Sequence, residues 1–336
     1  MKRKLMIKKE VLIKRWDNKK EQNAQINIMR KFIILLLILN IYKVSAQKYI
    51  LLDNIKGKVK EYTLSTKELY GIDKKISMYN VFSNNNVIVL FTVLPQYEDI
   101  THKKEVTDYV GLAKTMGTTK IEKQKKEDIN WEKIDYDRIR DKVKEVWNIE
   151  SDIMSEWGWD NTPEKKTLEY LVVKKIGKDY YAAKNCLTEV FNIESPKYPI
   201  ITPYGTINIA ENKVSIKDMQ EAFKKQYPKS VFPLDIWEKS QSRGDGGIYT
   251  VRNYLSKEYK VKNNNAYQLW TLDSWWNMHG DNHHRGIDRF VYIPEKGIVG
   301  GSYDFYFRNP RGFRIADTVL WQNIINEKVM IAEELK

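Results

Sequence analysis

A short apolar segment near the N-terminus decides which part of this chain has to form a folded core. Between residues 29 and 47, two basic residues precede an uninterrupted apolar run at 32–39, and the stretch Val44-Ser45-Ala46 follows it. A basic head, a short apolar run and small residues, in this order, are typical of a secretory signal peptide. We therefore predict export to the periplasm or the extracellular space, with a mature protein that begins at Gln47.

The apolar run has two alternative interpretations, a membrane anchor and a buried core helix. A transmembrane helix needs about 20 apolar residues, whereas Asn40 and Lys43 interrupt this run. A core helix would not require the basic residues before the run and the small residues after it. No cysteine lies near the predicted cleavage point, so a lipid anchor on a new N-terminal cysteine is excluded. We expect no stable membrane span once the signal is removed.

The segment before Met29 is unusual for an exported protein, because it adds 28 residues ahead of the signal. It holds nine Lys and Arg against three Asp and Glu. One hypothesis is that Met29 is the true start and residues 1–28 are an upstream extension. The alternative is an unusually long basic head. In both cases residues 1–46 would be absent from the mature protein.

The positive charge of the chain is concentrated in this N-terminal part. Residues 1–46 hold 12 of the 57 Lys and Arg and 3 of the 44 Asp and Glu, so they contribute +9 of the formal net charge of +13. Residues 47–336 therefore carry only +4. A strongly basic mature surface is not supported by this balance, and we expect no nucleic-acid partner.

A single cysteine, Cys186, limits how the mature chain can be stabilised. No intramolecular disulfide is possible, so an exported fold has to rest on its apolar core. We interpret Cys186 as a small buried residue of a strand rather than as a nucleophile. The 290 residues from 47 to 336 suffice for one large domain or two ordinary ones.

Residues 47–120 are expected to be rich in strands. Residues 76–82 and 87–94 flank the turn Ser83-Asn84-Asn85-Asn86, and Asn tolerates the left-handed backbone that a tight turn needs. The run Val87–Phe91 is apolar on both faces. This pattern predicts a strand in the middle of a sheet, with both of its faces covered.

Residues 121–160 are expected to form a long, charged amphipathic helix. Residues 121–145 hold eight Lys and Arg and eight Asp and Glu, with opposite charges three residues apart. Apolar residues recur at steps of three and four, which predicts one buried stripe. The stripe consists of Ile139, Val143, Val146, Trp147, Ile153, Met154 and Trp157.

Residues 161–336 are expected to form a mixed C-terminal domain of antiparallel hairpins and two helices. One hairpin turns at Gly177, and a second joins 290–293 to a strand at 298–307 that carries Tyr303, Phe305 and Phe307 on one face. Ser215 and Asp218 resemble a capping box at the start of one helix, and Asp317 can cap the last helix. The predicted fold class is therefore α+β.

The segment 279–284 is the one group of residues in the sequence whose side chains could bind a metal ion or act in catalysis. It holds three of the four histidines of the chain and an aspartate, in a loop between two strands. Imidazole and carboxylate groups can bind zinc or a similar ion, so His279, Asp281, His283 and His284 are candidate metal ligands. Asp273, Asp288 or Asp304 could add a ligand. The alternatives are a polar loop with local hydrogen bonds and a metal-free acid–base or ligand contact, because the spacing matches no standard zinc pattern.

Aromatic residues crowd the same region and suggest a binding surface. Aromatic faces can stack on sugar rings, although such side chains also supply large apolar area to a core. The candidate binding residues are Trp270, Trp275, Trp276 and Arg285.

Two classes of function follow from these residues. The first is a non-catalytic exported protein that binds a surface partner or a glycan, with no cofactor. The second is a metal-dependent hydrolase that uses the histidine-rich loop. We favour the first, because no complete catalytic motif is present.

Overall fold

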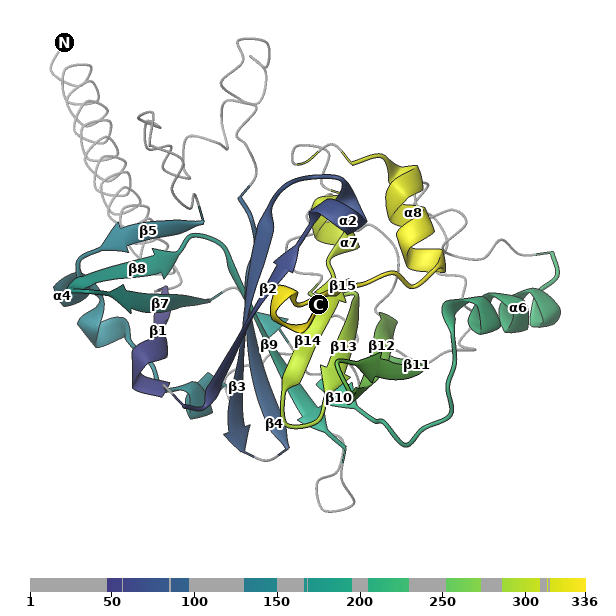
Figure 1. Cartoon of the computed structure of the whole chain (residues 1–336), viewed down its shortest axis with the longest axis horizontal. Helices are drawn as coiled ribbons and strands as arrows, with labels where there is room; N and C mark the ends of the chain where they lie inside the picture. Colours follow the sequence, from purple (N-terminus) through teal and green to yellow (C-terminus); the bar gives the residue numbers. More distant parts are fainter. Residues whose placement is uncertain are drawn as a thin grey trace, which may run out of the picture. The chain divides into compact units, whose positions relative to one another are not determined.

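Three β-sheets dominate the fold, and the α+β prediction is therefore wrong. The computed structural model describes residues 47–55, 57–84, 86–96, 130–149, 166–167, 169–194, 205–229, 252–272, 286–308, 313 and 315–336. Figure 1 shows the arrangement of the elements. Helices in the described residues are short, and the longest, α6, covers Ile216–Gln226.

The middle sheet has the strand order β10-β9-β4-β3-β2. Its strands are β2 (Val59–Ser65), β3 (Lys75–Asn84), β4 (Val87–Val93), β9 (Cys186–Ile193) and β10 (Thr206–Ile207), and β6 (Lys166–Thr167) pairs with β9. The hairpin predicted from the asparagine-rich turn is confirmed, since β3 and β4 are antiparallel neighbours. All seven residues of β4 are buried between β3 and β9, which confirms the predicted central strand.

A five-stranded antiparallel sheet with the order β11-β12-β13-β14-β15 packs on one face of the middle sheet. Its strands are β11 (Arg252–Val261), β12 (Asn264–Leu272), β13 (Arg289–Ile293), β14 (Gly297–Ser302) and β15 (Met330–Ile331). The predicted hairpin at residues 290–302 is confirmed. Its second strand ends at Ser302, however, and α7 (Asp304–Phe307) follows, so the predicted strand to Phe307 is wrong.

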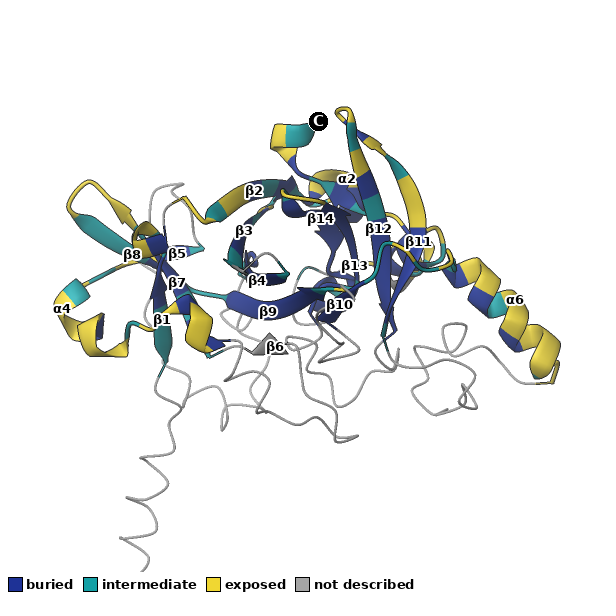
Figure 2. Ribbon diagram, turned by 90° about the horizontal axis from the view of Figure 1, so that it is seen from below, coloured by how far each residue is buried: buried dark blue, intermediate teal, exposed yellow. Residues whose placement is uncertain are grey.

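The core between these two sheets takes alternate residues from strands β2, β3 and β4 of the middle sheet. Ile88, Leu90 and Phe191 of the middle sheet meet Leu269 and Phe290 of the five-stranded sheet. Figure 2 shows the strands of both sheets around this core. The helices α2 (Lys67–Tyr70), α6, α7 and α8 (Asp317–Ile325) add buried residues to it.

Polar side chains join the two sheets across this apolar core. Asn80 of β3 donates from Nδ2 to the Ile298 carbonyl (2.9 Å), and its Oδ1 accepts from the Ile298 N–H (2.7 Å). A Cβ on Gly297 would lie 2.6 Å from the same Oδ1, so the close approach of Asn80 requires glycine there. Thr92 of β4 and Tyr303 share a hydroxyl–hydroxyl hydrogen bond of 2.8 Å. These contacts fix how the sheets stack.

Both ends of the two-sheet stack are also closed. At one end the Glu334 carboxylate of the 3₁₀ turn η6 (Glu333–Leu335) accepts from the Thr63 N–H of edge strand β2, at 3.1 Å for each oxygen. At the other end Asn253 of β11 donates to the Thr206 carbonyl of β10 (2.8 Å). Edge strands with open N–H groups invite pairing with other chains, and these contacts cover part of both edges.

The third sheet, with the order β1-β7-β8-β5, packs on the other face of the middle sheet. It consists of β1 (Lys48–Leu51), β7 (Tyr170–Ile176), β8 (Asp179–Ala183) and β5 (Trp131–Ile134), and the 3₁₀ turn η1 (Leu52–Ile55) follows β1. The predicted hairpin around Gly177 is confirmed by the pairing of β7 with β8. The central strands β4 and β9 of the middle sheet are therefore covered on both faces.

The predicted helix over residues 121–160 is wrong where the structure describes it. Residues 130–149 form β5, a single turn of helix α4 (Tyr136–Ile139), a 3₁₀ turn η3 (Arg140–Lys142) and helical residues 146–149. Trp147, which the predicted stripe buried, is 60 % exposed. Opposite charges three apart do pair, at Asp135/Arg138 and Asp137/Arg140, but within one short turn. Pairing of β5 with β8 outweighs the local helical pattern.

Of the two helix N-termini predicted in the C-terminal half, one has the predicted N-cap residue and the other does not. The Ser215 hydroxyl accepts from the Asp218 N–H, and the Asp218 carboxylate accepts from the Ser215 N–H, so the capping box of α6 is confirmed. Helix α8 exists, but Ala316 rather than Asp317 occupies its N-cap. Within the described residues, no helix has the length and apolar character needed to cross a membrane.

Candidate functional site

The predicted site lies at one end of the five-stranded sheet, where β12 leads into residues 273–285. Trp275, Trp276, His279, Asp281, His283, His284 and Arg285 lie outside the described residues. The strands on either side are described. Trp270 of β12 pairs with Arg289 of β13, and the Thr271 N–H donates to the Asp288 carbonyl (2.9 Å). The segment therefore connects the ends of two adjacent strands.

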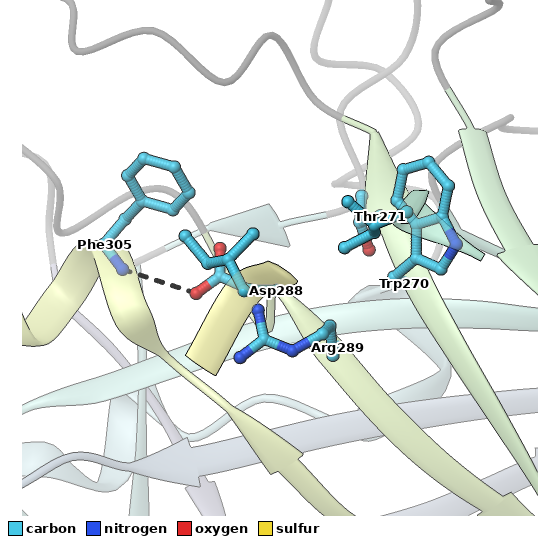
Figure 3. Close-up of a pocket in the computed structure, with 7 residues that line it drawn as sticks. Trp270, Thr271, Asp288, Arg289 and Phe305 are labelled. Carbon is cyan, nitrogen blue, oxygen red and sulfur yellow. Dashed lines mark hydrogen bonds between the residues drawn. The ribbon is translucent and has the colours of Figure 1, made fainter. Parts of the chain in front are cut away.

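A small cavity lies beside these strand ends. It is lined by Ile216, Trp270, Thr271, Asp288, Arg289, Phe305 and Ile324. It has room for about one water molecule. Figure 3 shows Trp270 and Thr271 on one side, Phe305 on the other, and Asp288 and Arg289 between them.

Trp270 forms a wall of this cavity and does not face solvent. Its side chain is 1 % exposed and stacks on Tyr254 with ring centres 4.8 Å apart. Its indole Nε1 donates to the Val214 carbonyl (2.8 Å), which satisfies the one polar group of the ring. Trp270 can contact a ligand only through the cavity.

Asp288 is one of the three carboxylates that the sequence offered as additional metal ligands. It is half-buried, and its Oδ2 accepts from the Phe305 N–H at the start of α7 (3.4 Å). Asp304 is instead fully buried in an ion pair with Arg289, with 2.6 Å between Nη2 and Oδ2. Asp273 lies outside the described residues. Asp304 is thus committed to the core, and Asp288 lines the cavity.

The Arg289–Asp304 ion pair is buried at the cavity, which Arg289 lines. The side chains are 2 % and 0 % exposed, and Nε and Nη2 of Arg289 also donate to the Lys328 carbonyl (3.1 and 3.0 Å). Burial raises the pKa of Asp304 above its usual range, although the Arg289 guanidinium opposes that rise. Burial also raises the pKa of Tyr70 well above normal, and the nearby Asp304 adds to it.

A second buried carboxylate, Glu189, holds the strand end from the middle sheet. Both of its oxygens accept from the Ile287 N–H (3.3 and 3.1 Å), and the residue is 0 % exposed. On the other side of Ile287, the Thr271 hydroxyl lies 3.4 Å from the Ile287 carbonyl and 2.8 Å from Asn253 Oδ1. Buried polar side chains from three strands therefore fix the point where the chain returns from residues 273–285.

Sequence reasoning did not identify Glu189 as part of this site. The available signal was its position, a single carboxylate within the otherwise apolar and neutral strand Cys186–Ile193. A charged residue in a buried strand requires a partner. That partner, the Ile287 N–H, is 98 residues away in sequence, so no local pattern could reveal it.

The described residues contain the one cysteine of the chain and none of its four histidines. No group of three or more His, Cys, Asp or Glu that could hold a metal ion occurs there. Cys186 is buried, as expected, and burial raises its pKa to about 12. A thiol with this pKa is a poor nucleophile near neutral pH.

The chain matches no known protein family, no curated protein and no solved structure.

Proposed function

We propose that this chain is an exported binding protein whose ligand contacts the β12–β13 end of the five-stranded sheet. The ligand class that we favour is a glycan, and a protein on a cell surface is the other partner with the same requirements. Export is supported by the signal-like segment at residues 29–47. The mature chain would begin at Gln47.

The observation that carries the binding proposal is the combination of groups at one strand end. Asp288 offers a half-buried carboxylate, and the Thr271 hydroxyl, which donates to Asn253 Oδ1, lies next to it in the lining formed with Trp270 and Phe305. The cavity has room for about one water molecule, so a glycan would contact its rim and would not enter it. Sites for small ligands combine aromatic walls with a few fixed polar groups. The sequence adds Trp275, Trp276 and Arg285 to the connection between the same strands.

Rigid support for the strand end favours a binding role. Glu189 and Thr271 hold the backbone of Ile287 on both sides, and the Arg289–Asp304 pair lies directly behind. A site on fixed elements loses less conformational freedom when a ligand binds. The buried polar contacts therefore give the ligand-binding groups a stable base.

The test is a titration of the protein from Gln47 to Lys336 with soluble neutral and uronic-acid polysaccharides, followed by tryptophan fluorescence and thermal melting. Asp288→Asn keeps an acceptor for the Phe305 N–H but removes the charge, and we expect binding at least about tenfold weaker, equivalent to about 1.4 kcal/mol. Thr271→Val should also weaken polysaccharide binding.

The matched control is Asp179→Asn, at the turn between β7 and β8 on the third sheet. Asp179 pairs with Lys133 (2.9 Å) and lies on no strand of the candidate site. This variant should bind like the parent protein. Equal weakening by Asp179→Asn and Asp288→Asn, or no binding of any polysaccharide by the parent protein, would contradict the glycan proposal.

A metal-dependent hydrolase is the second candidate, and the position of Asp288 favours it specifically. This carboxylate lines the cavity at the end of the sheet to which residues 279–284 connect. A site of this kind would use zinc or a similar ion, held by histidines with Asp288 as an additional oxygen ligand. Zinc, manganese and nickel should be measured in protein purified without a histidine tag. Stoichiometric metal that is lost in both His279→Ala and Asp288→Asn would favour the hydrolase over the binding protein.

A further inference from the structure

The hairpin of β7 and β8 ends in an exposed apolar side chain. Ile176, the last residue of β7, is 56 % exposed. It pairs with Asp179 across the turn Gly177-Lys178. A Cβ added to Gly177 would meet no atom within 4 Å, so the turn has open space around it. Figures 1 and 2 show this turn at the end of the third sheet that is directed away from the middle sheet. Ile176 therefore lies at a projecting tip of the third sheet.

Two lysines of the β7–β8 tip, which comprises residues 174–181, lie over aromatic rings. The Lys174 ammonium lies 3.9 Å from the centre of the Trp131 ring, and the Lys175 ammonium lies 5.3 Å from the centre of the Tyr180 ring. Neither ammonium forms an ion pair within the described part of the chain. The rings therefore hold the two side chains in place, and their charges stay available to an external anion.

Positive charge exceeds negative charge at the β7–β8 tip. The Asp179 carboxylate lies 2.9 Å from the Lys133 ammonium, and Asp53 Oδ2 accepts from the Lys175 N–H (3.0 Å). Lys178 is exposed in the turn and has no carboxylate partner among the residues that the structure describes. Lysines 133, 174, 175 and 178 thus outnumber aspartates 53 and 179 by two. The two carboxylates at the start of α4 do not change this surplus, because each pairs with an arginine three residues later.

Tyrosines lie behind the apolar residue and the lysines. Tyr180 is half-buried and stacks on Tyr136 of α4, with ring centres 4.6 Å apart. Tyr181 is also half-buried and pairs across the sheet with Lys174. From the turn inward, the order is an apolar side chain, ammonium groups and aromatic rings. Proteins that lie on a membrane surface use the same order, with the apolar group at the acyl boundary and tyrosine and lysine among the headgroups.

We propose that the β7–β8 tip docks on the surface of an anionic lipid bilayer. Ile176 enters the boundary between headgroups and acyl chains, and the ammonium groups of Lys174, Lys175 and Lys178 pair with lipid phosphates. The long lysine stems allow these groups to stay among the headgroups while the apolar tip goes deeper. The proposal is independent of the glycan site, which lies on the five-stranded sheet.

The shape of the tip favours a bilayer over a protein partner. A stable protein interface takes about 800 Å² from each partner, whereas one tight turn and its flanking side chains offer a small convex surface. A bilayer accepts a projecting side chain anywhere on its surface and surrounds it with anionic groups. With one apolar side chain and few charges, the docking should be reversible and should weaken as salt screens the lysines.

The experiment uses residues 47–336, since Lys48–Lys336 forms a compact unit of its own. Omission of the basic segment before it excludes lipid binding by that segment. Cosedimentation is measured with phosphatidylcholine vesicles, with and without phosphatidylglycerol. We expect binding only to the anionic vesicles, and release at high salt. The double variant Ile176→Ser/Lys175→Gln should bind at least about tenfold more weakly, equivalent to about 1.4 kcal/mol.

The matched control is Val319→Ser/Lys217→Gln, which removes one exposed apolar group from α8 and one exposed charge from α6. It should bind vesicles like the parent protein. A polarity-sensitive dye on Ile176→Cys should shift to shorter wavelength on anionic vesicles, and the same dye on Val319→Cys should not. Cys186 is buried and stays unlabelled in the folded protein.

Three results would overturn the proposal. They are no binding of the parent protein to anionic vesicles, equal binding by the double variant and its matched control, and an unchanged dye at residue 176. Binding of an acidic polypeptide without binding of vesicles would also overturn it and would assign the β7–β8 tip to a protein partner. All four substituted side chains are exposed, so the circular dichroism of each variant should match that of the parent protein.

Discussion

Loss of Asp304 and loss of Arg289 from their buried ion pair should have different effects on stability. Removing one member of a buried ion pair costs about 3–5 kcal/mol, because the other charge is left without its partner. Arginine cannot lose its proton in a protein, so Asp304→Asn leaves a permanent charge in the core. We expect a loss of about 3–5 kcal/mol in the free energy of unfolding near neutral pH.

The converse change, Arg289→Met, should cost less and should depend on pH. Burial already raises the pKa of Asp304, and without the guanidinium that pKa rises further, so the carboxyl can become neutral. A carboxyl whose pKa is raised in the folded state adds stability at low pH, and this stability is lost as the pH rises through the folded pKa. We expect a loss of about 1–3 kcal/mol at about pH 5, mainly from the unpaired Lys328 carbonyl, and a larger loss at about pH 8.

The assay is urea unfolding of the parent, both single variants and the double variant Arg289→Met/Asp304→Asn, followed by circular dichroism at both pH values. The double variant leaves no buried charge, so its loss should be close to that of Arg289→Met and well below the sum of the two single losses. Additive losses, or equal and pH-independent losses for the two single variants, would refute the reasoning.

Three further predictions concern single side chains. Trp147→Ala should change the free energy of unfolding by no more than about 0.5 kcal/mol, because Trp147 is 60 % exposed. Phe223→Ala in the core should cost about 3–5 kcal/mol. Equal losses for the two variants in urea unfolding would contradict this prediction. Cys186, with its pKa raised to about 12, should react with a thiol reagent near neutral pH only after unfolding, and rapid labelling of the native protein would show that it is not buried. Glu189→Gln keeps an acceptor for the Ile287 N–H and should be much less destabilising than Glu189→Ala. The alanine variant leaves that N–H unpaired, at a cost of about 1–3 kcal/mol. Similar urea midpoints for the two variants would contradict the role given to Glu189.

The features of the fold that could be predicted from the sequence are those set by neighbouring residues. The apolar run Val87–Phe91 has no polar face, so a strand covered on both sides was the simplest interpretation, and β4 confirms it. The hairpin of β3 and β4 and the capping box at Ser215 depend on residues within a few positions of one another. Such local signals survive in the folded state because the tertiary structure agrees with them.

The pattern at residues 130–149 misled because local and long-range preferences differ there. Charged pairs three apart favour a helix, and they do form, but only in the turn around Asp135–Lys142. Trp131 is buried in β5, where it packs with Tyr79 of the middle sheet, with ring centres 6.3 Å apart. Pairing with β8, about fifty residues later in the sequence, decides the conformation.

The candidate site was predictable only in part for the same reason. The residues between β12 and β13 were recognised from their composition, and the structure shows that the strands on either side are neighbours. Glu189, which holds this end of the sheet through the Ile287 N–H, lies 98 residues before Ile287 in the sequence. The sequence of one strand does not show which distant part of the chain its side chains will contact in the fold.

Hydrogen–deuterium exchange with and without the polysaccharide that binds most tightly tests the central claim most directly. The account predicts slower exchange in the bound state at the amides of Thr271, Leu272 and residues 286–289, and no change in β5, β7 and β8. Protection confined to the third sheet, or none at residues 286–289, would contradict a binding site at the β12–β13 end.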